Sequence, residues 1–195
     1  MNTHDVHGLI LSGGKSTRMG SDKGTLHYHG LPQREYLFDL ASQYCPKVFY
    51  SIREDQINEF QGHPYIQDHN DYRGPLNGIL SAHKQFPEKA WLVLACDLPL
   101  LDASSISDLV AARDIDKTAT SFATKTSGLP EPLVSIWEPK GLQKAIEYMQ
   151  EAKSSCPRRF LIHSDIKLVY PDNDQVLYNA NSIGEYEHAI NLIEK

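Results

Sequence analysis

A glycine-rich loop with several cations follows the first apolar run of the chain. The run ends in Gly13 and Gly14, and Lys15, Arg18 and Lys23 follow within nine residues. Glycine lets a backbone turn sharply and bring its N–H groups close to a bulky anion, and a guanidinium can bind two phosphate oxygens at once. The pattern therefore predicts polyphosphate binding. The alternative is an ordinary surface loop that carries cations by chance.

Two common phosphate-binding motifs are excluded for this loop. Gly14-Lys15-Ser16 matches the end of a Walker loop, but that motif also needs glycine at position 9, where the chain has Leu9. The GxGxxG pattern of dinucleotide-binding folds is absent from the sequence.

An aspartate follows the most apolar expected strand, Trp91–Cys96. Ligands of open α/β sheets bind beyond the carboxyl ends of the strands, where Asp97 would lie. A carboxylate there can hold Mg²⁺, which prefers one or two carboxylates together with phosphate oxygens and water. We therefore expect Asp97 to bind metal. The alternatives are a turn before Pro99 or a cap of the helix near Ser105, and Cys96 is expected to be a small buried apolar residue.

The elements that must position these residues alternate along the chain. Short apolar runs alternate with amphipathic segments, which predicts a three-layer α/β fold with a mostly parallel central sheet. The expected strands are His7–Ser12, Thr25–His29, Lys47–Ile52, Tyr65–Asp68, Trp91–Cys96, Thr118–Ala123, Leu133–Trp137, Leu168–Tyr170 and Val176–Asn179. The expected helices are Arg34–Gln43, Asp55–Phe60, Leu76–Phe86, Ser105–Arg113, Gly141–Lys153 and Ile183–Ile193.

Composition narrows the class of protein. With 195 residues, 41% of them apolar and 23% charged, we expect one domain over residues 1–195. The net charge of −6 disfavours a general nucleic-acid binder, and no run approaches the roughly 18 apolar residues of a membrane span. Three cysteines without CxxC spacing favour a reducing cytoplasm. His27 and His29 have no third metal ligand nearby, so we expect them on an exposed hairpin.

Three segments resemble one family of nucleotidyltransferases. LSGGKSTRMGSDK, residues 11–23, resembles the LAGGxSxRMGxDK motif of the molybdenum cofactor guanylyltransferases, with Ser12 where that family has alanine. ACDLPLL is similar to the family's C-D-x-P segment, whose aspartate binds magnesium and nucleotide, and residues 68–78 are similar to an acidic residue followed by GPLxG. The resemblance implies a Rossmann-like nucleotidyltransferase fold. It implies GTP contacts from Leu11, Ser12, Gly13, Gly14, Lys23, Asp68 and Asp97, Mg²⁺ on Asp97, and catalytic roles for Arg18, Lys23 and Asp97. Asp71 is the alternative to Asp68.

The second half of the chain resembles the family's acceptor side. Leu129–Trp137 is similar to a proline-leucine strand near the pterin, where Glu131 departs from the family's neutral or basic residue. Asn179 and Asn181 match an N-x-N-T motif, although capping of the last helix by Asn181 or Ser182 explains them equally well. A cationic pair, Arg158 and Arg159, is either solvated or placed to receive the acceptor's phosphate.

The resemblance implies that the chain transfers GMP from GTP to the phosphate of molybdopterin and releases pyrophosphate. Such chemistry needs positioning and charge stabilisation rather than a covalent protein intermediate. Proteins that deliver molybdopterin are expected as transient partners. The alternatives are a cytidylyl- or sugar-phosphate nucleotidylyltransferase on the same fold, or a catalytically silent nucleotide-binding protein.

Overall fold

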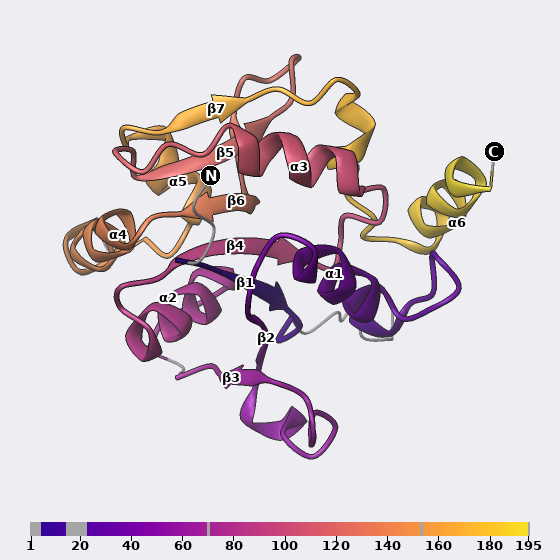
Figure 1. Cartoon of the computed structure of the whole chain (residues 1–195), viewed down its shortest axis with the longest axis horizontal. Helices are drawn as coiled ribbons and strands as arrows, with labels where there is room; N and C mark the ends of the chain where they lie inside the picture. The colour runs from indigo at the N-terminus through magenta and orange to yellow at the C-terminus, as the bar shows by residue number, and fades with distance from the viewer. Residues whose placement is uncertain (1–4, 15–22, 70, 153, 195) are drawn as a thin grey trace.

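A seven-stranded sheet with the strand order β3-β2-β1-β4-β6-β5-β7 forms the middle of the protein (Figure 1). The computed structural model describes residues 5–14, 23–69, 71–152 and 154–194. Neighbouring strands are parallel except at β6, which runs antiparallel to both β4 and β5. The strands are β1 (Val6–Leu11), β2 (Val48–Ile52), β3 (Tyr65–Gln67), β4 (Ala90–Ala95), β5 (Ala119–Ala123), β6 (Pro130–Trp137) and β7 (Lys167–Val169).

Helices cover both faces of this sheet, so the expected three-layer arrangement is confirmed. The helices α1 (Gln33–Ser42) and α3 (Ala103–Ala111) pack on one face, and α2 (Pro75–Gln85), α4 (Pro139–Ala152) and α5 (Pro157–Ile162) pack on the other. Successive side chains of a strand point to opposite faces. Ile10 and Leu92 therefore join the core under α1 and α3, whereas Leu9 and Trp91 join the core under α2 and α4.

The helix α6 (Ile183–Ile193) lies beside the chain that precedes α1 (Figure 1). It buries Ala189 against Tyr28, and the hydroxyl of Tyr186 donates a hydrogen bond to the carbonyl of His27. This packing explains why the expected strand Thr25–His29 is wrong. The alternating apolar residues there face α6 rather than a sheet, and the segment forms a 3-10 turn, η1 (Lys23–Thr25), and one isolated bridge, His27 to Pro32. His29 stacks on a tyrosine ring and bonds a backbone carbonyl.

Three further elements differ from expectation. The expected helix Asp55–Phe60 is a short 3-10 turn, η2 (Glu54–Gln56), followed by irregular turns. The expected strand Val176–Asn179 is the end of another, η3 (Asp174–Leu177), which Asn173 caps. The sequence prediction also missed α5, whose six residues are too few to show a helical period.

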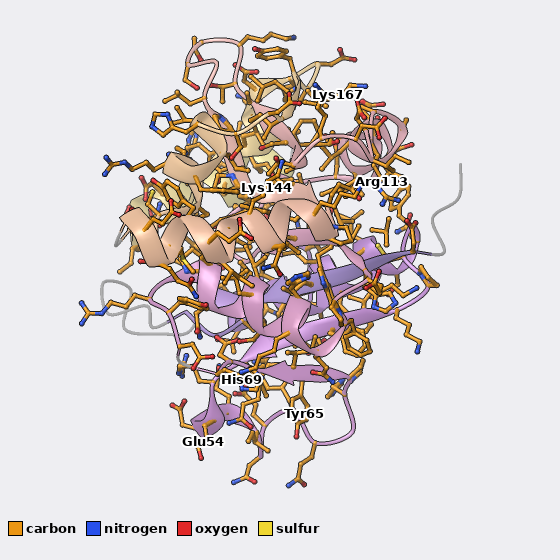
Figure 2. All side chains as sticks on the ribbon, turned by 90° about the vertical axis from the view of Figure 1, so that its left-hand side faces the viewer. Glu54, Tyr65, His69, Arg113, Lys144 and Lys167 are labelled. Carbon is orange, nitrogen blue, oxygen red and sulfur yellow. The ribbon has the colours of Figure 1, made fainter. Side chains whose placement is uncertain are left out.

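An ion-pair network lies at the edge of the sheet where the parallel strands begin. At the amino edge Arg113, two residues after α3, donates hydrogen bonds to Asp5 before β1 and to Glu138 after β6. The turn that carries Glu54 lies far from Arg113, at the other end of the molecule (Figure 2).

In the part of the chain that the structure describes, no helix has the length and apolar character needed to cross a membrane.

Candidate active site

A cavity of about 460 Å³ opens at the carboxyl ends of β1, β2, β3 and β4. This is the sheet edge at which the sequence predicts ligand binding. Residues predicted on the nucleotide side line this one cavity: Leu11, Ser12, Gly13, Gly14, Lys23, Asp68 and Asp97. Arg18, predicted to be catalytic, and its neighbour Lys15 lie outside the residues that the structure describes.

Lys23 and Asp97 meet at one end of the cavity, although they come from separate motifs. The Lys23 ammonium lies 3.8 Å from Asp97 Oδ2 and donates a hydrogen bond of 2.5 Å to Asn181 Oδ1. Burial raises the pKa of the Asp97 carboxyl, and the nearby Lys23 partly opposes that shift. Because the two side chains carry opposite charges, they can bind opposite partners: an anionic phosphate and a cation.

One oxygen of Asp97 is suited to a cation. Its Oδ1 atom is buried and finds no hydrogen-bond partner in the described part of the chain. Such an atom is costly unless something fills its coordination. No group of three or more His, Cys, Asp or Glu residues that could hold a metal exists among the described residues. A Mg²⁺ ion here would therefore take one protein carboxylate and complete its shell with ligand oxygens and water, which is typical of Mg²⁺.

Asp68 lies at the other end of the cavity. The Ser51 hydroxyl donates a hydrogen bond of 2.7 Å to Asp68 Oδ1. Burial raises the pKa of the Asp68 carboxyl, while hydrogen bonds from Ser51 and Asn77 lower it. Asp71, the sequence alternative, is exposed, forms an ion pair of 3.5 Å with Lys84 and is not among the residues that line this cavity. The geometry therefore favours Asp68 over Asp71 as a nucleotide contact.

The first helix turn of α2 packs closely behind Asp68. A Cβ atom at Gly78 would lie 2.2 Å from the Ser51 hydroxyl oxygen and 3.2 Å from Asp68 Oδ1, so the backbone there approaches as only glycine permits. Pro75 at the start of α2 has no N–H to leave unpaired. The GPLNG segment thus fixes the floor of the cavity.

Sequence reasoning missed Arg53 and Gln56, whose side chains bond the backbone of the glycine loop. Arg53 also lines the cavity. Arg53 Nη1 donates a hydrogen bond of 2.6 Å to the carbonyl of Gly13, and Gln56 Nε2 donates one of 3.1 Å to the carbonyl of Ser12. A signal was available for Arg53, since it is a cation directly after a buried strand at the ligand edge. Its partner in the loop is distant in sequence, so no local pattern reveals the contact.

The Asn179–Asn181 segment reaches the site through its backbone. Ala180 N–H donates to the carbonyl of Asp97 at 2.9 Å, and this places Asn181 beside Lys23. Asn179 instead donates a 3.4 Å hydrogen bond to the backbone two residues earlier. Ser182 caps α6 by accepting from the Glu185 N–H, so the capping alternative holds for Ser182.

Arg158 and Arg159 lie on α5 and are not among the residues that line the cavity. Arg158 donates hydrogen bonds to the carbonyl of Pro130 (3.0 Å) and to the Glu131 carboxylate (2.5 Å). Burial raises the pKa of Glu131, and Arg158 lowers it. Arg158 therefore already has an anionic partner, while Arg159 is exposed.

Known proteins resemble the chain in both sequence and structure. A sequence model described as MobA-like NTP transferase domain matches residues 8–167. A molybdenum cofactor biosynthesis bifunctional protein of Synechocystis sp. is 36% identical over 93% of this chain, which spans only 52% of that protein. A molybdenum cofactor guanylyltransferase of Pseudomonas fluorescens is 31% identical, with 89% of this chain and 88% of that protein covered.

A solved structure shares the fold. The crystal structure of molybdopterin-guanine dinucleotide biosynthesis protein A from Archaeoglobus fulgidus matches with a TM-score of 0.75 over 96% of this chain and 98% of that chain, at 17% identity. At that identity the likeness establishes the fold alone, which is the Rossmann-like arrangement expected from the sequence.

Proposed function

The chain belongs to the family of MobA-like NTP transferase domains, and from that premise we propose that it transfers GMP from GTP to the phosphate of molybdopterin. Pyrophosphate is released and a guanine dinucleotide form of the cofactor results. One observation carries the proposal: Lys23 and Asp97, from two separate motifs, meet 3.8 Å apart in the cavity that the glycine loop and Asp68 also line.

In this proposal the nucleotide lies along the carboxyl edge of the sheet. The base lies near Leu11–Gly13 and Asp68, and the phosphates extend toward Lys23 and Asp97. Guanine presents N1–H and N2–H₂ donors, and an acceptor such as the Asp68 carboxylate suits them. Asp68 serves equally well as an acceptor for a ribose hydroxyl.

The reaction needs orientation and charge stabilisation. A phosphate oxygen of the acceptor forms a bond to the α-phosphorus of GTP, and the bond from that phosphorus to the β-phosphate oxygen breaks in line. The acceptor phosphate is already ionised at neutral pH, so no general base is required. Lys23 stabilises the charge on the departing pyrophosphate, and Arg18 is assigned to the same task from its place in the motif. Asp97 would hold Mg²⁺, which would supply positive charge to the phosphates.

We assign the acceptor to the side of the cavity beyond Asp97. Asn181, beside Lys23, is the best placed of the predicted acceptor residues, and Asn179 follows the same segment. Arg158 would share its charge between Glu131 and the acceptor's phosphate, with Arg159 next to it. The proposed setting is the cytoplasm, where proteins that carry molybdopterin would deliver it by transient contact.

The test is mass analysis of the product formed from GTP, Mg²⁺ and purified molybdopterin, repeated with ATP, CTP and UTP. Selective formation of the guanine dinucleotide with pyrophosphate release is expected. Selective use of CTP or UTP would show a different nucleotidylyltransferase on this fold. Tight GTP binding without pyrophosphate release in the presence of acceptor would show a silent nucleotide-binding protein.

A further inference from the structure

Two consecutive peptide groups of the glycine loop are held from the same side by the turn after β2. The Ser12 carbonyl accepts from Gln56 Nε2, and the next carbonyl, that of Gly13, accepts from Arg53 Nη1. Ser12 N–H also donates to the carbonyl of Ser51 at 3.0 Å. The path of the backbone from β1 into the loop is therefore fixed at three successive hydrogen bonds.

These bonds determine where the loop's donors point. In a planar trans peptide the carbonyl of one residue and the N–H of the next point in opposite directions. Binding of the Ser12 and Gly13 carbonyls therefore turns the N–H groups of Gly13 and Gly14 away from Arg53 and Gln56. Both glycines line the cavity, as does Arg53, whereas Gln56 is not among the residues that line it. The Arg53 guanidinium on the Gly13 carbonyl also polarises that peptide group, which strengthens the Gly14 N–H as a hydrogen-bond donor.

Hydrogen bonds within the turn after β2 connect Arg53 to Asp55 and Gln56. The Asp55 carboxylate accepts from Arg53 Nε (2.8 Å) and Nη2 (3.2 Å), which fixes the plane of the guanidinium. The Gln56 side chain is buried, and its oxygen accepts from the Arg53 N–H at 3.0 Å while its nitrogen reaches Ser12. Arg53 and Gln56 thus act as one unit.

We propose that Arg53 is a positioning residue that makes the site select guanine over adenine. The inference rests on the proposed function, in which the base lies near Leu11–Gly13 and Asp68. Asp68 Oδ2 lies beside Gly13, only 3.0 Å from where a Cβ atom of that glycine would be. The loop thus offers N–H donors next to a carboxylate acceptor. Guanine O6 accepts a hydrogen bond where adenine carries an amino donor, so a fixed N–H favours guanine and opposes adenine.

The experiment compares GTP with ATP in three variants. Arg53→Gln removes the charged donor. Arg53→Lys keeps the charge but lacks the planar guanidinium that bonds Gly13 and Asp55 together. Gln56→Glu replaces the donor to the Ser12 carbonyl by an acceptor. The dissociation constant, kcat and KM are measured for both nucleotides, with ATP also tested as a competitor. Glu54→Gln, an exposed position in the same turn, is the control.

Arg53→Gln is expected to lower kcat/KM for GTP by roughly tenfold, the effect of one charged hydrogen bond, and to leave the value for ATP unchanged. The ratio of kcat/KM for GTP to that for ATP then falls by the same factor. Arg53→Lys should give a smaller fall in this ratio than Arg53→Gln, and KM for molybdopterin should not change. A merely structural role would lower kcat/KM for both nucleotides by the same factor and leave their ratio unchanged.

An unchanged ratio in Arg53→Gln and Gln56→Glu, on a wild-type protein that selects GTP, overturns the inference alone. A wild-type protein that does not select GTP over ATP overturns the guanine assignment and, with it, this role for Arg53. Thermal unfolding of each variant establishes that it is folded, and Gln56→Glu supplies the test if Arg53→Gln does not fold.

Discussion

At the scale of single residues, the site contains a buried carboxylate that destabilises the folded state. Asp97 has one buried oxygen without a partner in the described part of the chain, and burial raises its pKa. A buried polar atom of this kind is unfavourable unless a ligand completes it. The residue is therefore better explained by binding than by stability.

Asp97→Asn is expected to keep the free energy of unfolding close to that of the wild type, because the amide keeps the shape and removes the buried charge. Turnover should fall by roughly 10²–10³-fold, as for loss of one charge-stabilising group. Pyrophosphate release and urea unfolding measure the two effects. Asp71→Asn, on an exposed aspartate, is the matched control and should leave both values unchanged. Near-normal turnover of a folded Asp97→Asn protein would contradict the assignment.

The sequence predicted residues of this site when their role depends on a local pattern. Gly13, Lys23 and Asp97 belong to short motifs at strand ends, and the structure brings them to one cavity. Arg53 acts through the Gly13 carbonyl, and Asn181 meets Lys23 from far along the chain. Contacts of this kind depend on how the strands are ordered in the sheet, which no local spacing encodes.

At the scale of elements, buried strands were the most predictable part of the fold. Segments such as VFYSI and WLVLA are almost entirely apolar because helices cover both faces of the sheet. The strand predictions were wrong where apolar residues of a turn or irregular segment pack into the core. Leu26 and Tyr28 alternate like a strand but pack against α6, and Val176 and Leu177 enter the core from a 3-10 turn.

The packing of α2 on β2 and β3 yields a second prediction. Gly78→Ala would place a methyl group 2.2 Å from the Ser51 hydroxyl oxygen, so Ser51 and Asp68 must move. We expect a loss of about 1–3 kcal/mol in unfolding free energy and weaker GTP binding. Calorimetric titration and urea unfolding measure both. Gly184→Ala in α6 has open space around the new methyl and should be neutral or stabilising. Equal effects of the two changes would refute the packing argument.

The aromatic cluster between β1, β2 and β4 yields a pH prediction. His7 packs against Phe49, Phe86 and Trp91, and burial lowers its pKa below the ordinary value of 6.5. The unfolded chain then binds a proton more readily than the folded one, so stability is present above pH 6.5 and is lost as the pH falls toward the lower folded pKa. His7→Leu should reduce the loss of unfolding free energy between pH 7.5 and 5, although His83, shifted in the same direction, retains part of it. Urea unfolding at the two pH values checks this, and an unchanged difference would exclude His7 as a cause.

At the scale of the whole molecule, the candidate site and a buried ion-pair network lie at opposite edges of the sheet. The cavity lies at the carboxyl edge of the parallel strands, and the Arg113 network lies at the amino edge. Arg113 joins the residue before β1 to the residue after β6, so it ties together parts of the chain that are far apart in sequence.

Arg113→Met should destabilise the protein by about 3–5 kcal/mol, because Glu138 stays buried without its cationic partner. KM for GTP should not change, since the site is at the other edge. The double variant Arg113→Met with Glu138→Leu removes both charges and should recover much of the loss. Chemical denaturation and steady-state kinetics test these outcomes, and a raised KM in a folded Arg113→Met protein would contradict the separation of the two edges.

The reversed direction of β6 has a consequence for how such a scaffold diversifies. Because β6 runs against β4, its first residues arrive at the edge where β4 ends, and Leu133 reaches the cavity from there. One wall of the cleft thus starts from a hairpin, while the opposite wall consists of strand-to-helix loops. A hairpin tip tolerates insertion and shortening without repacking the layers. Residues 124–129, the tip of this hairpin, can therefore change in length while the cavity residues that precede β5 stay in place.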